Sequence, residues 1–102
     1  MDNSQKREKL QSLLAQKHGY EWEYNECLRE IGDLKQNYHD FLETEPVDAT
    51  KELKRLPDAD YNLCAALLTM LLREDHWING SFEQRCRNGE VTPILQRMID
   101  LL

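Results

Sequence analysis

The chain has 102 residues and a formal net charge of −6, and 40% of its residues are hydrophobic and 31% are charged. These values are typical of one small soluble domain or of a domain with an extension. They oppose non-specific binding to nucleic acid, for which clustered lysine and arginine supply most of the affinity. The longest apolar stretch, Leu63 to Leu72, is too short for a membrane span of roughly 20 residues, so we expect no contact with a membrane.

The first residues, Met1 to Arg7, contain neither an apolar signal core nor a cleavage-like site. Cys27, Cys64 and Cys86 form no CxxC pair, and an odd number of cysteines cannot pair off completely within one chain. We therefore expect a cytoplasmic protein with reduced thiols that fill the core or lie partly buried.

Apolar residues recur at helical spacing almost everywhere, which predicts an all-α fold. Within residues 4–43, steps of three and four residues define a heptad-like seam, which Leu14, Leu28 and Leu42 widen beyond that of a simple two-stranded coiled coil. The seam consists of Leu10, Leu13, Lys17, Tyr20, Tyr24, Cys27, Ile31, Leu34, Tyr38 and Phe41. We expect this coiled-coil-like face to pack on the C-terminal half, on a second copy of the chain, or on both.

Gly19 permits two interpretations of this segment. Either one long or gently bent helix continues through it, or a first helix ends near residue 18 and a second runs from about Tyr20 to Glu43. The unbroken periodicity across Gly19 favours the single helix. Gly32 falls at an outer position, where no break is expected.

Thr44 to Asp48 is predicted to be a linker because Pro46 disfavours a helical residue before it. Beyond it we predict helices over about 49–56, 59–75 and 81–88 and a final helix after Thr92. Asp48 and Asp58 are the expected caps of the first two, Ser81 with Gln84 forms a capping box, and Asn88-Gly89 ends the third. The helix containing residues 63–72 is apolar nearly all round and is the expected centre of the core.

The predicted organisation is therefore a long helical segment over 1–43, a linker over 44–48 and a compact module of about four helices over 49–102. The two parts, divided after residue 43, each carry a net charge of −3, so neither is a basic arm.

The run from Leu67 to Gly80, with Asn88-Gly89-Glu90-Val91 and Ile94 to Met98 after it, resembles the C-terminal segment of a bacterial protein family of unknown function. The resemblance covers about residues 61–102. His76 stands where a second basic residue is expected in that family. The resemblance implies a helical fold and a bacterial or phage origin, and it implies nothing about chemistry.

Functional groups are densest at the end of the central helix, where Arg73, Glu74, Asp75, His76 and Trp77 follow one another. Adjacent helical residues point in different directions, and no nucleophile follows at a recognisable spacing, so we interpret these residues first as a helix terminus and second as a binding surface. The last two helices can imitate a helix-turn-helix, but the final one offers mainly Gln96 and Arg97 to a DNA groove.

A second candidate surface lies within the N-terminal segment. Its acidic members are Glu21, Glu23, Glu26, Glu30 and Asp33, with Arg29 the only basic residue among them. Trp22 lies at an outer position that the seam does not use, and tryptophan is over-represented among interface anchors. These residues are either a solvated helix face or a recognition surface for a basic protein.

We expect no catalytic residues, metal or cofactor. His18, His39 and His76 are far apart, His39 with Glu43 makes only half a metal site, and no phosphate-binding or hydrolase motif is present. The leading hypothesis is a non-enzymatic, oligomerising or partner-binding regulatory protein. The alternatives are an acidic inhibitor, of phage type, that mimics nucleic acid, and a DNA-binding regulator.

Overall fold

A computed structural model describes residues 1–16 and 19–102. Within these residues the chain is all-helical and has no strand. In chain order the elements are α1 (Asn3–Leu14), α2 (Glu21–Ile31), the 3-10 helix η1 (Tyr38–Phe41), α3 (Ala49–Leu53), the 3-10 helix η2 (Leu56–Asp58), α4 (Tyr61–Trp77), α5 (Ser81–Arg87) and α6 (Thr92–Leu101). The all-α prediction is therefore confirmed.

The prediction of one long helix over residues 4–43, with a coiled-coil seam, is wrong. Helix α1 ends at Leu14, and α2 begins only at Glu21, so the alternative break near Gly19 is correct. Added at Gly19, a Cβ atom would overlap the Cys86 side chain, so the close approach of α5 requires glycine there.

Helix α2 also ends twelve residues earlier than that alternative expects. Gly32 has a φ of 81° and ends the helix in the left-handed conformation. The Gly32 amide donates to the Arg29 carbonyl, and the Asp33 amide donates to the Leu28 carbonyl at 2.9 Å, which together form a Schellman motif. The same pair of bonds at Gly89 ends α5, as the sequence predicts.

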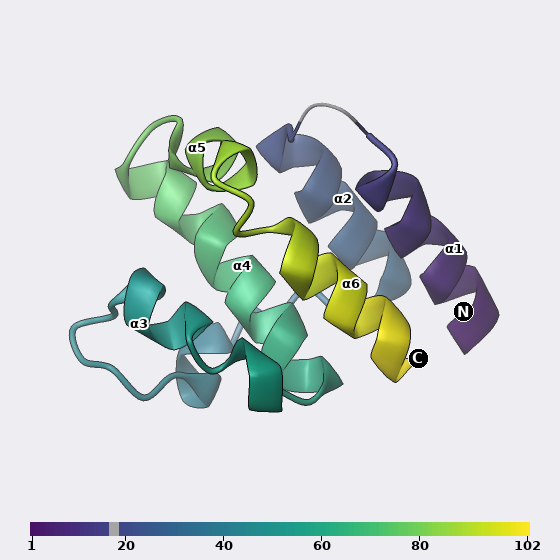
Figure 1. Cartoon of the computed structure of the whole chain (residues 1–102), viewed down its shortest axis with the longest axis horizontal. Coiled ribbons are helices and arrows are strands. Elements are labelled where there is room, and N and C mark those ends of the chain that lie inside the picture. The colour runs from purple at the N-terminus through teal and green to yellow at the C-terminus, as the bar shows by residue number, and fades with distance from the viewer. Residues whose placement is uncertain (17–18) are drawn as a thin grey trace.

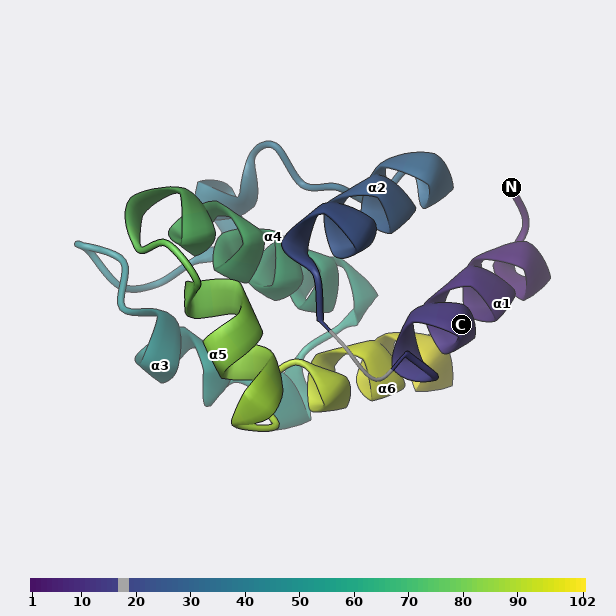
Figure 2. The same cartoon turned by 90° about the horizontal axis from the view of Figure 1, so that it is seen from above.

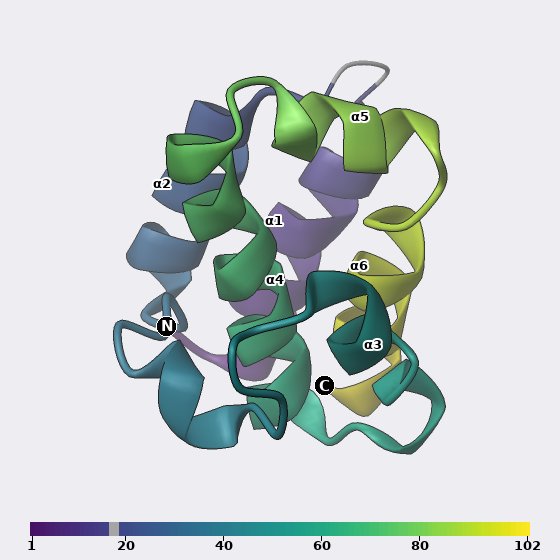
Figure 3. The ribbon, with the colours of Figure 1, turned by 90° about the vertical axis from the view of Figure 1, so that its left-hand side faces the viewer.

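Helix α4 is the centre of the molecule, as predicted, although Asp60 rather than Asp58 caps it. Every residue from Cys64 to Leu72 is buried, and α2, α3, α5, α6 and η1 all contact this helix. Figure 3 shows α4 between α2 and α6, with α5 crossing one end of the bundle. Thr69, the one polar residue of this buried stretch, donates to the Ala65 carbonyl and accepts a hydrogen bond from the Lys35 amide.

The predicted seam is largely covered by the chain itself. Leu10 and Leu13 of α1 and Tyr24, Cys27 and Ile31 of α2 lie in one core cluster with the apolar residues of α4 and α6. Leu34 and Tyr38 pack against this core, whereas Tyr20 is exposed. Figures 1 and 2 show α1 beside α6, so the N-terminal segment folds onto the C-terminal helices. The radius of gyration of 12.5 Å is close to the roughly 13 Å of a compact domain of this length.

Two further helix starts differ from the prediction. Ser81 is the first residue of α5 rather than its cap, because Gly80 precedes it with a φ of 86°. The Phe82 amide donates instead to Asp75 Oδ1 at 3.1 Å. A side chain near the end of α4 thus accepts a hydrogen bond from one of the free amides in the first turn of α5. Thr92 is likewise the first residue of α6, and Val91 precedes it.

Candidate functional sites

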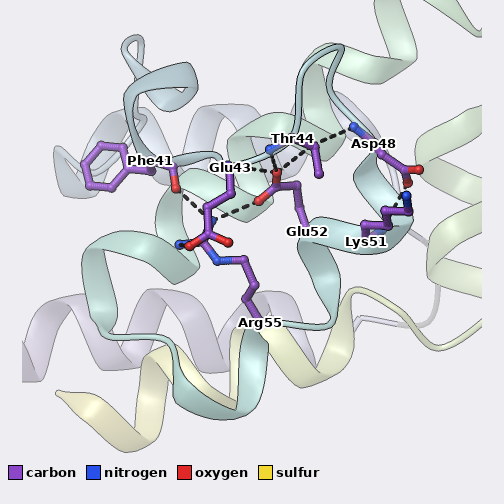
Figure 4. Close-up of polar contacts among 7 residues, drawn as sticks. All are labelled: Phe41, Glu43, Thr44, Asp48, Lys51, Glu52 and Arg55. Atoms are coloured by element: carbon purple, nitrogen blue, oxygen red, sulfur yellow. Dashed lines mark hydrogen bonds and ion pairs between the residues drawn. The ribbon is translucent and has the colours of Figure 1, made fainter.

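The most connected ionisable group is Glu52 of α3, which is fully buried (Figure 4). Its carboxylate accepts hydrogen bonds from the Glu43 amide, from the amide and hydroxyl of Thr44, and from the guanidinium of Arg55 at 2.9 Å. Burial alone would raise the pKa of Glu52, but the hydrogen bonds from Thr44, Arg55 and Glu43 outweigh it and hold this pKa at about 2.

The hydrogen bonds of Glu52 hold residues 43 and 44, at the start of the predicted linker, against α3. Arg55 also donates to the Phe41 carbonyl and pairs with Glu43, and the Thr44 hydroxyl accepts from the Asp48 amide (Figure 4). Asp48 caps α3 as predicted. Because every oxygen of Glu52 faces a donor from its own chain, we interpret this cluster as structural.

Asp33 does not belong to the acidic surface that the sequence suggests. It is buried, accepts a 2.6 Å hydrogen bond from the Tyr61 hydroxyl and pairs with Lys6 Nζ at 3.1 Å. Burial and the hydrogen bond to Asp33 raise the pKa of Tyr61, so this hydroxyl is a poor proton donor to a substrate. The three side chains join α1, the chain beyond α2 and the start of α4.

The cluster Arg73 to Trp77 is divided among several roles. Glu74 receives two hydrogen bonds from Arg85, at 2.7 and 2.9 Å, and Asp75 caps α5. His76 is exposed, and Trp77 is 87% exposed. The structure therefore brings no acid and base of this run together for proton transfer, and it leaves His76 and Trp77 accessible at the surface. Arg73 points to Asn25 of α2, 3.4 Å away.

Trp77 lies beside a pocket that the sequence does not predict. Together with Ile78 and Val47 it forms an exposed apolar patch, hereafter the Trp77 patch. The adjacent pocket has a volume of about 250 Å³. Its lining consists of Tyr38, His39, Val47, Ala49, Met70, Glu74, Trp77 and Ile78. Two separate stretches of the chain, residues 38–49 and 70–78, build it, so no single stretch carries its signature.

The second exposed tryptophan, Trp22, borders a groove between α1 and α2, hereafter the Trp22 groove. Trp22 is 65% exposed, and the groove has a volume of about 250 Å³. Its lining consists of Lys9, Ser12, Leu13, Gln16, Trp22, Glu23, Glu26, Cys27 and Glu30. The structure thus brings Trp22 together with three of the five predicted acidic residues. Glu21 lies on α2 but does not line the groove.

Two of the three carboxylates in the Trp22 groove have cationic partners. Lys9 Nζ lies 2.8 Å from Glu30, and its hydrogen bond and charge lower the pKa of that carboxyl. Arg29, which follows Glu26 by three residues on α2, donates hydrogen bonds to both carboxylate oxygens of Glu26. With Lys9 and Arg29 both counted, the groove carries three acidic side chains against two basic ones, and Glu23 is the lining carboxylate without an ion pair among the described residues.

Among the described residues, no group of three or more His, Cys, Asp or Glu side chains is arranged so that it could hold a metal ion. His18 lies outside the described residues. His39 stacks on Tyr38, while Glu43 pairs with Arg55. Burial raises the pKa values of Cys27, Cys64 and Cys86 to about 11, which favours the protonated thiols near neutral pH.

The last two helices give little to a DNA groove. Arg97, the only basic residue of α6, donates to the Ala59 carbonyl at 2.7 Å, and Gln96 donates to Asp100. Of the arginines on α5, Arg85 is held by Glu74 and Glu90, and Arg87 lies 3.3 Å from Gln84.

Among the described residues, no helix is both long and apolar enough to span a membrane. The model of a family described as "Family of unknown function (DUF6508)" matches residues 5–102. The similarity to a family of unknown function is therefore not confined to residues 61–102, the part of the chain that carries the resemblance described above. No curated protein and no solved structure shows a significant match.

Proposed function

Because the chain belongs to this family of unknown function, we propose a role from its own surfaces: it acts without catalysis, by binding a basic protein partner in the Trp22 groove. The observation that carries the proposal is the exposure of Trp22, at 65%, above a groove bordered by Glu23, Glu26 and Glu30. Tryptophan is enriched among the residues that contribute most of the binding energy at protein interfaces.

The charges of the groove support a basic partner over a neutral one. Carboxylates around an interface steer an oppositely charged protein and mainly raise the association rate. A buried aromatic anchor acts differently, since its loss mainly speeds dissociation. The two kinds of residue in the Trp22 groove therefore predict two separable kinetic effects.

The experiment is capture of partners from an extract of the source cell on immobilised protein, followed by binding kinetics with the captured protein. We expect a basic protein to be retained by the wild type. Trp22→Ala should raise its dissociation rate, and Glu23→Gln with Glu26→Gln should lower its association rate and the salt dependence of that rate. Leu101→Ala removes another exposed apolar side chain, outside both pockets, and is the matched control.

Equal retention by the wild type and Trp22→Ala would contradict the proposal. The identity of the partner then separates the two leading hypotheses. A nucleic-acid-binding partner that DNA displaces from this protein favours an acidic inhibitor, whereas a partner that keeps its DNA favours a regulatory binding protein.

The packing of the N-terminal seam weakens the argument for self-association through that seam. The seam, which the sequence allows to pack on the C-terminal half, on a second copy or on both, contributes Leu10, Leu13 and Ile31 to the core of a single chain. A homo-oligomer would therefore need another surface, and a partner protein in the Trp22 groove is the simpler proposal.

A further inference from the structure

The pocket beside the Trp77 patch shares no residue with the Trp22 groove, so it is a separate surface. It lies between η1, the chain before α3 and the C-terminal part of α4. Its volume of about 250 Å³ falls below the roughly 300–1,000 Å³ of pockets that hold drug-sized ligands. The space suits one side chain of a partner better than a cofactor.

Aromatic rings and apolar walls line this pocket together. Tyr38 stacks on His39 with ring centroids 4.2 Å apart, and Trp77, at 87% exposure, leaves its indole open to a partner. The faces of indole and phenol rings attract cations, and tryptophan does so most strongly. Val47 and Met70 supply apolar surface that the methylene stem of a long cationic side chain can cover.

The chain that supplies half of the pocket lining is weakly acidic. Residues 35–51, which contribute Tyr38, His39, Val47 and Ala49 to the pocket, contain four carboxylates against two lysines, one at each end. These carboxylates are Asp40, Glu43, Glu45 and Asp48. Arg55 pairs with Glu43, and Arg85 already neutralises Glu74 in the pocket wall, so attraction for a further cation comes from the aromatic faces and the remaining carboxylates.

We propose that this pocket binds a lysine or arginine side chain of a partner protein, with the charged head group against the Trp77 indole and the stem along the apolar wall. This site lies apart from the Trp22 groove and does not depend on the function proposed for that groove. The competing possibility is an apolar side chain in this pocket. Side-chain-acetylated tetralysine, which carries no side-chain charge, distinguishes the two.

The test uses the full chain with Trp22→Phe, so that Trp77 is the only indole. Tetralysine, tetraarginine and side-chain-acetylated tetralysine are titrated into the ¹⁵N-labelled protein. We expect saturable shifts of the Trp77 indole and of the Val47 and Ile78 amides with at least one cationic peptide. The acetylated peptide keeps the stem and lacks the charge, and we expect it to leave these signals unchanged.

Two variants of Trp77 separate cation binding from apolar contact. Trp77→Leu keeps an apolar side chain without a ring face and should weaken binding about three- to thirty-fold, whereas Trp77→Phe should weaken it less. Because Trp77 is exposed, both variants should keep the wild-type circular dichroism spectrum. The proposal is overturned if the acetylated peptide binds equally, if Trp77→Leu binds like its parent, if shifts occur only on α2, or if no saturable shift occurs at the Trp77 patch.

Discussion

The Tyr61 hydroxyl donates a 2.6 Å hydrogen bond to Asp33 Oδ2, which joins the first residue of α4 to the chain just beyond α2. Lys6 of α1 approaches the same carboxylate oxygen at 3.1 Å. Three segments of the chain thus meet at one buried carboxylate.

Tyr61→Phe should destabilise the protein by about 1–3 kcal/mol, because it removes a donor from a buried carboxylate and leaves the ring in place. Urea unfolding monitored by circular dichroism gives the free energy of unfolding of each variant. Tyr38→Phe is the control, since no hydrogen bond of the Tyr38 hydroxyl is found within the described residues. Equal losses in both variants would mean that the bond to Asp33 contributes nothing specific.

Glu52 should make stability depend on acid pH. Its pKa is about 2 in the folded protein and about 4.3 in an unfolded chain, so the unfolded state binds the proton first as the pH falls. The contribution of Glu52 is complete above about pH 4.3 and is lost as the pH falls towards 2. Its pH-dependent part amounts to about 3 kcal/mol.

The measurement compares the unfolding free energies of the wild type and Glu52→Gln from neutral pH downwards. The difference should be largest near neutral pH and should shrink below about pH 4.3. Glu45→Gln changes an exposed carboxylate of the same segment and should show no such trend. A difference that stays constant with pH would contradict the assigned role of the Glu52 charge.

Leu68→Ala should cost about 2–5 kcal/mol, because Leu68 is fully buried in α4 and its truncation leaves a cavity. Such a loss is a large part of a small domain's stability. Thermal and urea unfolding both report it, with the exposed Leu101→Ala as the reference. Melting of Leu68→Ala within a degree or two of wild type would place the centre of the core elsewhere.

Ile31→Asp should unfold the single chain rather than dissociate an oligomer. Ile31 is buried by the helices of its own chain, and an unpaired charge there costs several kcal/mol. We expect loss of the helical signal at every protein concentration, whereas Gln36→Asp, at an exposed position, stays folded. A folded Ile31→Asp variant whose mass is half that of the wild type would show that this face joins two chains.

The sequence by itself determined the features that depend on local spacing. Helical periodicity established the all-α class, the run of residues 63–72, apolar except for Thr69, identified the central helix, and Asn88-Gly89 marked the end of α5. These signals are local because each helix turn and each glycine stop involves residues only three to five positions apart.

Only the tertiary structure decided which surface covers the N-terminal seam and which polar residues are structural. A seam of Leu10 to Ile31 looks the same in sequence whether a second copy or α6 covers it, since burial depends on residues far along the chain. For the same reason the sequence did not show that Asp33 is bonded to Tyr61, that Asp75 accepts a hydrogen bond from the start of α5, or that Glu52 is buried. The pocket beside Trp77 joins residues 38, 47 and 77, which only the fold brings together.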